Sequence, residues 1–318
     1  MKEDLVFGPV PSRRLGKSLG INNIPPKICT YTCVYCQLGR SLKIEIERKA
    51  YYNPEEIFAS VKNKIKKVKE SKEKIDYLTF VPDGEPTLDI NLGKEVDLLK
   101  EFDIPIAIIT NSSLINRKDV VKDLLKFDLV SIKVDAISEF YWKKIDRPNH
   151  LLNLNSILNG IKSFDLIYKG ILISETMVIR GIDYKNEFEK IAIFLSSLKF
   201  LKKAYISIPI RPPAENWVEP PDEQFLNEVY YKFSKYLGDK VEYLIGYEGN
   251  AFYTSGNIKE DILSITSVHP MREDAIEKLL KNTNSDWKAI EELINDDLIK
   301  EVLYKGHKFY LKKFYKNR

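Results

Sequence analysis

The stretch "KICTYTCVYCQLGR", residues 27–40, contains all three cysteines of this 318-residue chain. They are Cys29, Cys33 and Cys36, so their spacing is CxxxCxxC. An odd number of clustered cysteines does not suit a secreted disulfide framework and indicates metal or redox chemistry in a reducing compartment. Three thiolates can hold three irons of a cubane 4Fe–4S cluster and leave the fourth iron open, whereas ferredoxin-type carriers supply four cysteines.

A zinc site is the structural alternative for these cysteines. It would need a histidine to complete it, and the chain has three: His150, His269 and His307. All of them are remote in sequence, and none is paired with another ligand at the spacing of a zinc finger. The cysteine pattern therefore favours the cluster over zinc.

Strand-like and helix-like segments alternate along most of the chain up to about residue 237. The strand candidates are apolar runs at 18–24, 75–81, 104–110, 128–136, 170–179 and 204–210. The helix candidates between them, among them 54–70, 116–127 and 186–200, have apolar residues at three- and four-residue spacing. This alternation predicts parallel strands with right-handed crossovers, in an open sheet or in a barrel that falls short of eight repeats.

Two of the strand candidates have one polar face. In residues 129–136 the two-residue period places Ser131, Lys133 and Asp135 on one side, opposite valine and isoleucine side chains. On the last strand candidate, Tyr205, Ser207 and Arg211 likewise lie on one side, opposite isoleucine side chains. A barrel strand covered by helices is apolar on both faces unless its inner face lines a polar site, so this pattern predicts a ligand-holding interior. The alternative is a Lys–Asp pair at a solvated strand end.

Tyr35 precedes the third cysteine, so the motif reads CxxxCxφC with an aromatic φ. With this motif the chain resembles the radical S-adenosylmethionine (SAM) superfamily over residues 5 to about 237. The resemblance implies an α/β fold, an incomplete (β/α)6 barrel with the cluster loop after its first strand. It also implies two cofactors: one 4Fe–4S cluster on Cys29, Cys33 and Cys36, and SAM bound at the open iron.

A second motif, "VPDGEPTL" at residues 81–88, is similar to the GGEP segment of the superfamily, with Asp83 in place of the first glycine. In the superfamily this segment engages the methionine amino group of SAM. Gly84 lets the main chain approach a ligand closely, and Glu85 can accept a hydrogen bond from an ammonium group. The cofactor-binding residues that the resemblance implies besides the cysteines are Tyr35, Gly84, Glu85, Asn111, Ser131, Lys133 and Asp135.

The chemistry that the resemblance implies is reductive. The cluster receives an electron from a small donor such as a ferredoxin or flavodoxin, SAM is cleaved, and a 5′-deoxyadenosyl radical takes hydrogen from an unreactive carbon. The protein supplies orientation and a dry cavity. Glu175 and Arg180 border the fifth strand candidate, and either could face the substrate instead of SAM.

Three further stretches resemble a group of radical SAM proteins described as wyosine-synthase-like. They are "FGPVPSRRLGKSLGIN" (7–22), "RPPAENWVEPP" (211–221) and "SVHPMRED" (267–274). Basic residues also lie on both sides of the cluster strand: Arg13, Arg14, Lys17 and Arg40. They suit phosphates or the SAM carboxylate, and a solvated basic loop is the alternative.

The end of the chain, residues 262–318, is predicted to form a separate winged-helix-like module. A connecting segment, 238–261, would join it to the barrel, residues 1–237. Within the module, helix candidates at 272–284 and 285–296 precede a hairpin whose turn is a "KG" pair.

The second helix of this module carries Asp286, Glu291, Glu292 and Asp296 against one Lys288, which disfavours sequence-specific DNA binding. The hairpin has the opposite character. Its basic residues are Lys305, Lys308, Lys312, Lys313, Lys316 and Arg318, and its aromatic residues are Phe309, Tyr310, Phe314 and Tyr315. This mixture suits RNA phosphates and unstacked bases, which makes RNA a candidate partner. A basic tail around aromatic core residues is the alternative.

The chain has no apolar run near the roughly twenty residues that span a bilayer and no apolar leader, so we expect a cytoplasmic protein without a membrane partner. Its net charge of +4 permits an anionic partner. The preferred hypothesis is a radical SAM enzyme that modifies RNA, above all tRNA. The second is a radical SAM enzyme acting on a peptide, protein or small molecule held by the winged-helix module. The third, a non-catalytic Fe–S sensor, leaves the GEP segment and the polar strand faces unexplained.

Overall fold

The computed structural model describes residues 5–246, 249–250 and 252–313. Its main element is an eight-stranded sheet in the order β1-β2-β5-β6-β7-β8-β9-β10. The strands are β1 (Val6–Ser12), β2 (Gly16–Ile21), β5 (Tyr77–Phe80), β6 (Ile106–Thr110), β7 (Leu129–Lys133), β8 (Ile171–Met177), β9 (Leu201–Ser207) and β10 (Val241–Leu244). β1 runs antiparallel to β2, and the neighbours from β2 to β10 are parallel.

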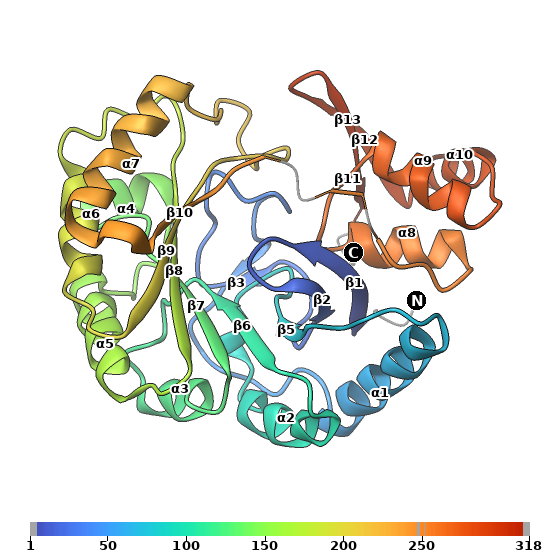
Figure 1. Cartoon of the computed structure of the whole chain (residues 1–318), viewed down its shortest axis with the longest axis horizontal. Coiled ribbons are helices and arrows are strands. Elements are labelled where there is room, and N and C mark those ends of the chain that lie inside the picture. The colour runs from blue at the N-terminus through green and yellow to red at the C-terminus, as the bar shows by residue number, and fades with distance from the viewer. Residues whose placement is uncertain (1–4, 247–248, 251, 314–318) are drawn as a thin grey trace.

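Helices connect the parallel strands and cover the outer face of the curved sheet (Figure 1). They are α1 (Pro54–Glu70), α2 (Leu92–Leu99), α3 (Lys118–Leu124), α4 (Glu139–Ile145), α5 (Leu154–Ile167), α6 (Glu187–Ser196) and α7 (Glu223–Leu237). In α1, Asn53 caps the helix by accepting from the Glu55 N–H, and proline at the first position needs no N–H partner. The buried side chains of α1 recur every three or four residues, at Ile57, Val61, Ile65 and Val68.

The predicted α/β class with a mostly parallel sheet is confirmed, and each predicted strand of the barrel is present. The sheet is larger than predicted, because β1 and β10 add a strand at each edge. The segment 238–261 therefore contributes a strand in addition to a connection. The sequence of β10, "VEYL", is too short to show a period, and β1 contains Pro9 and Pro11, which sheets tolerate at their edges.

The C-terminal unit consists of α8 (Ile258–Thr266), β11 (Met271–Arg272), α9 (Glu273–Asn282), α10 (Lys288–Asn295), β12 (Ile299–Tyr304) and β13 (His307–Lys312). Its three strands have the order β11-β13-β12. The two predicted helices and the hairpin are confirmed, and both turn residues, Lys305 and Gly306, have positive φ, as tight hairpins require. The unit begins at Ile258, within the predicted connection.

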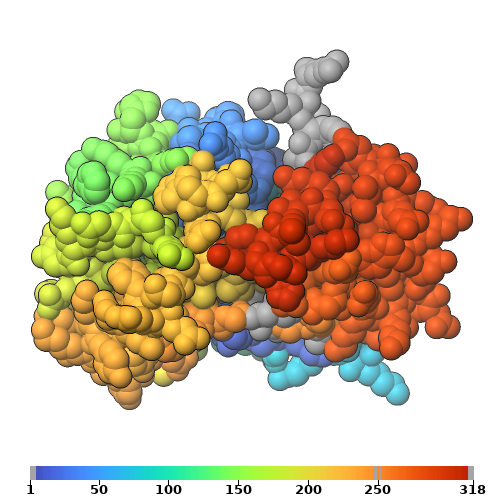
Figure 2. Space-filling model, turned by 90° about the horizontal axis from the view of Figure 1, so that it is seen from above, coloured from blue at the N-terminus to red at the C-terminus, as the bar shows by residue number. Residues whose placement is uncertain are grey.

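The C-terminal unit packs on the edge strand β1. Phe7 and Val10 of β1 share a buried core with Ile262 and Met271 of the unit. On the other side, Tyr304 OH donates to Pro209 O at 3.1 Å, and in Figure 2 the red hairpin reaches the gold segment that follows β9. The unit thus touches the barrel at the edge strand β1 and at the loop that follows β9. Among the described residues, no helix combines the length and the apolar character needed to cross a bilayer.

Candidate active site

The cysteines lie in the segment that follows β2, at the carboxyl end of the parallel strands, where α/β folds bind ligands. Cys29 ends the short strand β3 (Ile28–Cys29), which pairs with β4 (Lys43–Ile44). Cys33 and Cys36 follow in the loop between these two strands. One loop therefore carries all three candidate ligands.

The end of helix α4 holds this loop in place. The Thr32 N–H donates to Asp146 O at 3.1 Å, and the Val34 N–H donates to Ile145 O at 2.9 Å. Because α4 ends at Ile145, these carbonyls have no partner inside the helix, and the loop satisfies them. Main-chain hydrogen bonds from the end of α4 thus fix the position of the loop.

The surroundings of the three thiols fit an iron–sulfur cluster. Burial, assisted by the charge of Glu85, raises the pKa of Cys29 to about 12, and burial also raises the pKa of Cys33 and of Cys36. Such thiols become thiolate ligands when bound metal offsets the cost of charging them. Asn111 Nδ2 lies 3.5 Å from Cys29 Sγ, and polar contacts of this kind tune cluster sulfurs.

A zinc site fits these residues less well. Within the described ranges, no group of three His, Cys, Asp or Glu side chains is arranged to hold a single metal ion. A cubane cluster does not need such convergence, because each cysteine binds its own iron. Of the candidate histidines, His269 is hydrogen-bonded to Arg211, and His150 and His307 are exposed.

A cavity of about 320 Å³ opens beside the loop, and Tyr35, Cys36, Gln37 and Leu38 form part of its wall. The remaining wall comes from the inner face of the barrel, the turn between β1 and β2, and the C-terminal unit. The polar or charged residues that these three parts contribute are Ser12, Arg13, Arg14, Ser18, Thr79, Lys133, Glu175, Ser207, Arg211 and His269. The predicted polar interior is therefore present, and each of the stretches 7–22, 211–221 and 267–274 contributes to it.

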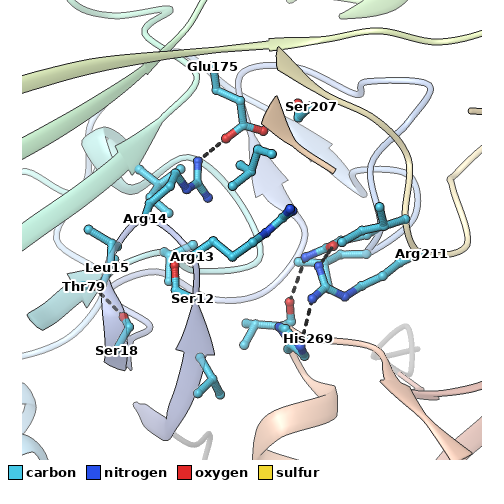
Figure 3. Close-up of a pocket in the computed structure, with 18 of the residues that line it drawn as sticks. Ser12, Arg13, Arg14, Leu15, Ser18, Thr79, Glu175, Ser207, Arg211 and His269 are labelled. Carbon is cyan, nitrogen blue, oxygen red and sulfur yellow. Dashed lines mark hydrogen bonds and ion pairs between the residues drawn. The ribbon is translucent and has the colours of Figure 1, made fainter. Parts of the chain in front are cut away.

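The turn between β1 and β2 crosses the open side of the barrel. Arg14 Nη1 donates to Glu175 on β8, as Figure 3 shows. Arg13 donates to the carbonyl of Ile245, directly after β10. Because β1 and β10 are the two edges of the sheet, the Arg13 bond joins these edges, whereas the Arg14 bond connects the turn to the interior strand β8. Of the other predicted basic residues, Lys17 pairs with Glu73 and Arg40 with Glu215, and neither lines the cavity.

Three of the predicted cofactor-binding residues form one contact network. Lys133 Nζ lies 3.1 Å from Glu175 Oε1 and 3.7 Å from Asp135 Oδ1. Tyr35 OH donates to Asp135, and Lys133 Nζ lies 4.9 Å from the centre of the Tyr35 ring. The network ends at Asp146, whose Oδ1 lies 3.4 Å from Tyr35 OH. No motif or spacing in the sequence marks Asp146, which also lies 3.5 Å from Cys33 Sγ.

Lys133 and Glu175 of this network keep one another ionised despite their burial. Burial would raise the pKa of Glu175, but the charges of Arg14 and Lys133 outweigh it and lower this pKa to about 2. Burial would lower the pKa of Lys133, but Asp135 and Glu175 raise it. Lys133 is therefore a fixed positive charge at the cavity wall, and Glu175, which the sequence left unassigned, is a fixed negative one. Arg180 is exposed and lies near Glu219.

Gly84 brings the segment after β5 against the cysteine strand. The two form an isolated bridge, Ile28 with Gly84, and the Glu85 N–H donates to Ile28 O at 3.1 Å. A Cβ at Gly84 would lie 1.9 Å from Ile28 O, so no other residue allows this approach. The glycine of the GEP segment thus positions Cys29.

The Glu85 carboxylate is engaged inside the protein. Its oxygens accept from the Thr87 N–H and hydroxyl at 3.1 and 2.6 Å, from the Thr110 hydroxyl at 2.6 Å and from the Asn111 N–H at 2.8 Å. The side chain thus links the ends of β5 and β6. The contact of Glu85 with a SAM ammonium stays a prediction. The role of Ser131 in binding SAM also stays a prediction, and this side chain is buried in β7 and outside the cavity wall.

Two of the hairpin's aromatic residues are core residues. Phe309 and Tyr310 are 2% and 1% exposed, so they cannot stack on RNA bases without leaving the core. The lysines Lys305, Lys308 and Lys313 lie near the carboxylates of Glu219, Glu273, Glu301 and Asp297. This part of the hairpin fits the alternative interpretation, and Phe314, Tyr315, Lys316 and Arg318 lie outside the described residues.

Comparison with known proteins agrees with this site. The UPF0026 protein MJ1312 of Methanocaldococcus jannaschii is 52% identical over 310 residues, which cover 97% of this chain and 96% of that protein. The GTPase Obg of Brachyspira hyodysenteriae is 33% identical over 312 residues, and the match covers 93% of this chain but 45% of that protein. This chain therefore spans less than half of the second relative.

A crystal structure of a radical SAM methyltransferase from Sphaerobacter thermophilus has a similar fold, with a TM-score of 0.52 and 14% identity over 72% of this chain and 67% of that one. The sequence profile of the radical SAM superfamily matches residues 23–194, more than half of this chain. Members of this superfamily bind a 4Fe–4S cluster and SAM, the two cofactors that the cysteine loop and the adjoining cavity fit. The chain belongs to the radical SAM superfamily.

Proposed function

We propose that this protein is a radical SAM enzyme that cleaves SAM reductively to take hydrogen from a substrate in the cavity beside Cys36. The observation that carries the proposal is that the cysteine loop and the Lys133 network border one cavity, while the GEP segment is hydrogen-bonded to the strand that carries Cys29. When bound, the cluster supplies the electron that breaks the sulfonium bond of SAM. A small donor, a ferredoxin or flavodoxin, and a cytoplasmic setting belong to the proposal.

The residues of the chain have distinct roles in this function. Cys29, Cys33 and Cys36 would hold the cluster, and their loop is fixed by the end of α4. The Lys133 ammonium, held at the cavity wall by Asp135 and Glu175, has the charge to face the carboxylate of SAM. The C-terminal unit contributes Val268 and His269 to the wall, which helps to keep water from the reacting atoms.

RNA, above all tRNA, is the substrate class that we place first. The described cavity wall carries four cationic side chains, Arg13, Arg14, Lys133 and Arg211, against one carboxylate, Glu175. A cleft with such an excess of positive charge attracts phosphate-bearing ligands. The stretches that resemble the wyosine-synthase-like group contribute Arg14 and Arg211 to this wall, and on that resemblance we place the chain in that group.

A peptide, protein or small molecule is the second candidate substrate. The burial of Phe309 and Tyr310 favours it, because these two rings are then not available to stack on bases. We propose that the C-terminal unit is a winged helix, supported by its order of helix, strand, two helices and two strands. In this role it would hold the substrate against the barrel.

One anaerobic experiment tests these alternatives. The protein is reconstituted with iron and sulfide, given dithionite and SAM, and 5′-deoxyadenosine is measured with and without total tRNA. More product with tRNA supports the RNA substrate, and product without stimulation supports the second candidate. Fully loaded protein that yields no 5′-deoxyadenosine would overturn the enzyme proposal and favour the sensor.

A further inference from the structure

A buried ion pair lies beside the cysteine loop. Lys27 Nζ is 2.9 Å from Asp83 Oδ2, and the two side chains are 9% and 7% exposed. The backbones are joined as well, because the Lys27 N–H donates to Asp83 O at 2.7 Å. Lys27 Nζ also donates to the carbonyl of Leu38, two residues after Cys36. Lys27 therefore connects the beginning and the end of the cysteine loop.

This pair is unusual in its cost and in its position. Removing two opposite charges from water costs free energy that their attraction often fails to restore, so a buried ion pair needs a reason besides stability. Asp83 is also the residue at which this sequence departs from the GGEP motif. A glycine at that position would leave the Lys27 ammonium buried beside the loop without this carboxylate.

Both charges act on the last cysteine. Besides burial, the charge of Asp83 raises the pKa of Cys36 and the charge of Lys27 lowers it. Two opposite charges 2.9 Å apart give only a small net potential at a group that both of them reach. The ammonium group can therefore hold the loop without leaving a net positive charge beside the sulfur.

We propose that Lys27 and Asp83 form a charge-neutral clamp on the cluster loop. Lys27 holds the loop through the carbonyl of Leu38, and Asp83 cancels the effect that the lysine charge would have on the reduction potential of the cluster. The inference rests on the proposed function, because it requires a cluster on the three cysteines.

The sign of the expected effect follows from charge. Reduction adds a negative charge to a cluster, so a nearby ammonium stabilises the reduced form and raises the potential, and a nearby carboxylate lowers it. A cluster that must pass an electron to a sulfonium needs a low potential. Asp83 thus lets the chain use a lysine as a clamp while the cluster stays strongly reducing.

The charge role is tested by an EPR-monitored redox titration of the anaerobically reconstituted full chain without SAM. Asp83→Asn leaves Lys27 charged, and we expect the equilibrium constant for reduction to rise about tenfold, which is about 59 mV for one electron. Asp83→Gly removes the same charge and is expected to move the potential in the same direction. The double variant Lys27→Met/Asp83→Asn removes both charges and is expected to return to the wild-type potential.

A matched control breaks a different ion pair. Asp123 pairs with Arg48, whose side chain is 3% exposed, and Asp123 is not among the charges that shift the pKa of any of the three cysteines. Asp123→Asn is expected to leave the potential unchanged. Wild-type potentials in both single Asp83 variants, or an equal shift in the control, would overturn the charge role.

The clamp role has a separate readout. The double variant loses the bond from Lys27 to the carbonyl of Leu38, so we expect a chelator to remove its iron several-fold faster than from Asp83→Asn or the wild type. Release at the wild-type rate would overturn the clamp. Wild-type protein without the absorbance and EPR signal of a 4Fe–4S cluster would instead overturn the proposed function, and this inference with it.

Discussion

Arg211 Nη2 lies 2.9 Å from His269 Nε2, and this contact joins the barrel to the C-terminal unit at the cavity wall. A guanidinium only donates, so His269 accepts through Nε2 and its ring is neutral. Burial, and then the charge of Arg211, keep the pKa of His269 well below its usual value. Arg211 Nη1 also donates to Gln37 Oε1 at 2.8 Å, next to Cys36. One side chain therefore connects the cluster loop with both parts of the molecule.

We predict that Arg211→Leu lowers the free energy of unfolding by about 3 kcal/mol, because the buried His269 and the half-buried Gln37 lose their charged donor. Urea denaturation measures the change. The control is Arg180→Leu, since the exposed Arg180 lies 3.7 Å from Glu219 and is expected to matter by less than about 0.5 kcal/mol. Equal losses in the two variants would contradict this account of the contact.

Alanine at Cys29, Cys33 or Cys36 is expected to remove the cluster and SAM cleavage together, because each cysteine is the sole protein ligand of one iron. The measurements are the visible absorbance of the reconstituted protein and the yield of 5′-deoxyadenosine. Lys43→Ala, in the exposed strand β4 that pairs with β3, is the control and should keep both. A cysteine variant that still cleaves SAM would sink the ligand assignment.

The parts of this molecule that could be predicted are those with a local signal. The start of α1 follows from Asn53 and Pro54, a cap and a first-turn residue that mark a helix start in any sequence. The inner face of β7 follows from the two-residue period that puts Lys133 beside Asp135. The cysteine motif is also a local signal, because all three cysteines lie in one short segment of the chain.

The parts that could not be predicted depend on contacts between distant segments. His269 is 58 positions from Arg211, and nothing near either residue indicates the bond between them. Glu85 has the sequence of a ligand-binding acid, but its carboxylate is engaged by Thr110, a neighbour only in the folded sheet. The aromatic residue Phe309 alternates with lysines as in an RNA-binding surface, and only the packing of the unit shows it to be buried.

If the hairpin contacts RNA, replacing Lys312 and Lys313 with alanine should weaken tRNA binding and leave SAM cleavage without substrate intact. Each lost phosphate contact lowers the slope of log K against log salt by about 0.7 for single-stranded nucleic acid, so the double variant should lose about 1.4. Binding is measured by fluorescence anisotropy over a salt series. Lys62→Ala/Lys66→Ala, exposed on α1, is the control, and unchanged affinity in the hairpin variant would reject this contact.

Gly84→Ala is expected to weaken cluster binding. The loss should exceed the cost of placing an alanine in a backbone conformation that favours glycine. A Cβ at Gly84 meets Ile28 O at 1.9 Å, so the segment after β5 must move away from the strand that carries Cys29. Gly238→Ala is the control, because Gly238 has φ +60 with nothing within 4 Å and should cost about 1 kcal/mol from conformation alone. Iron content after reconstitution measures the effect, and a Gly84→Ala variant with the full iron load would refute it.

Stability should fall with rising pH because of Glu95, a buried residue of α2. Burial, and then the charge of Asp89, raise the pKa of Glu95 to about 10. Between the ordinary pKa of about 4.3 and this value, the folded state holds a proton that the unfolded state has lost, so raising the pH favours unfolding by up to about 1.4 kcal/mol per unit. This proton is fully lost from the folded state only above about pH 10.

Glu95→Gln removes the titrating proton and keeps the shape of the side chain. We therefore expect the stability of the variant, relative to the wild type, to increase as the pH rises from about 6 to about 9. Urea denaturation at several pH values measures the two curves. Glu101→Gln, at an exposed position close to the end of α2, is the control and should run parallel to the wild type. If the stability of Glu95→Gln instead runs parallel to that of the wild type over this pH range, Glu95 is already ionised in the folded protein. Burial and the charge of Asp89 would then not keep Glu95 protonated.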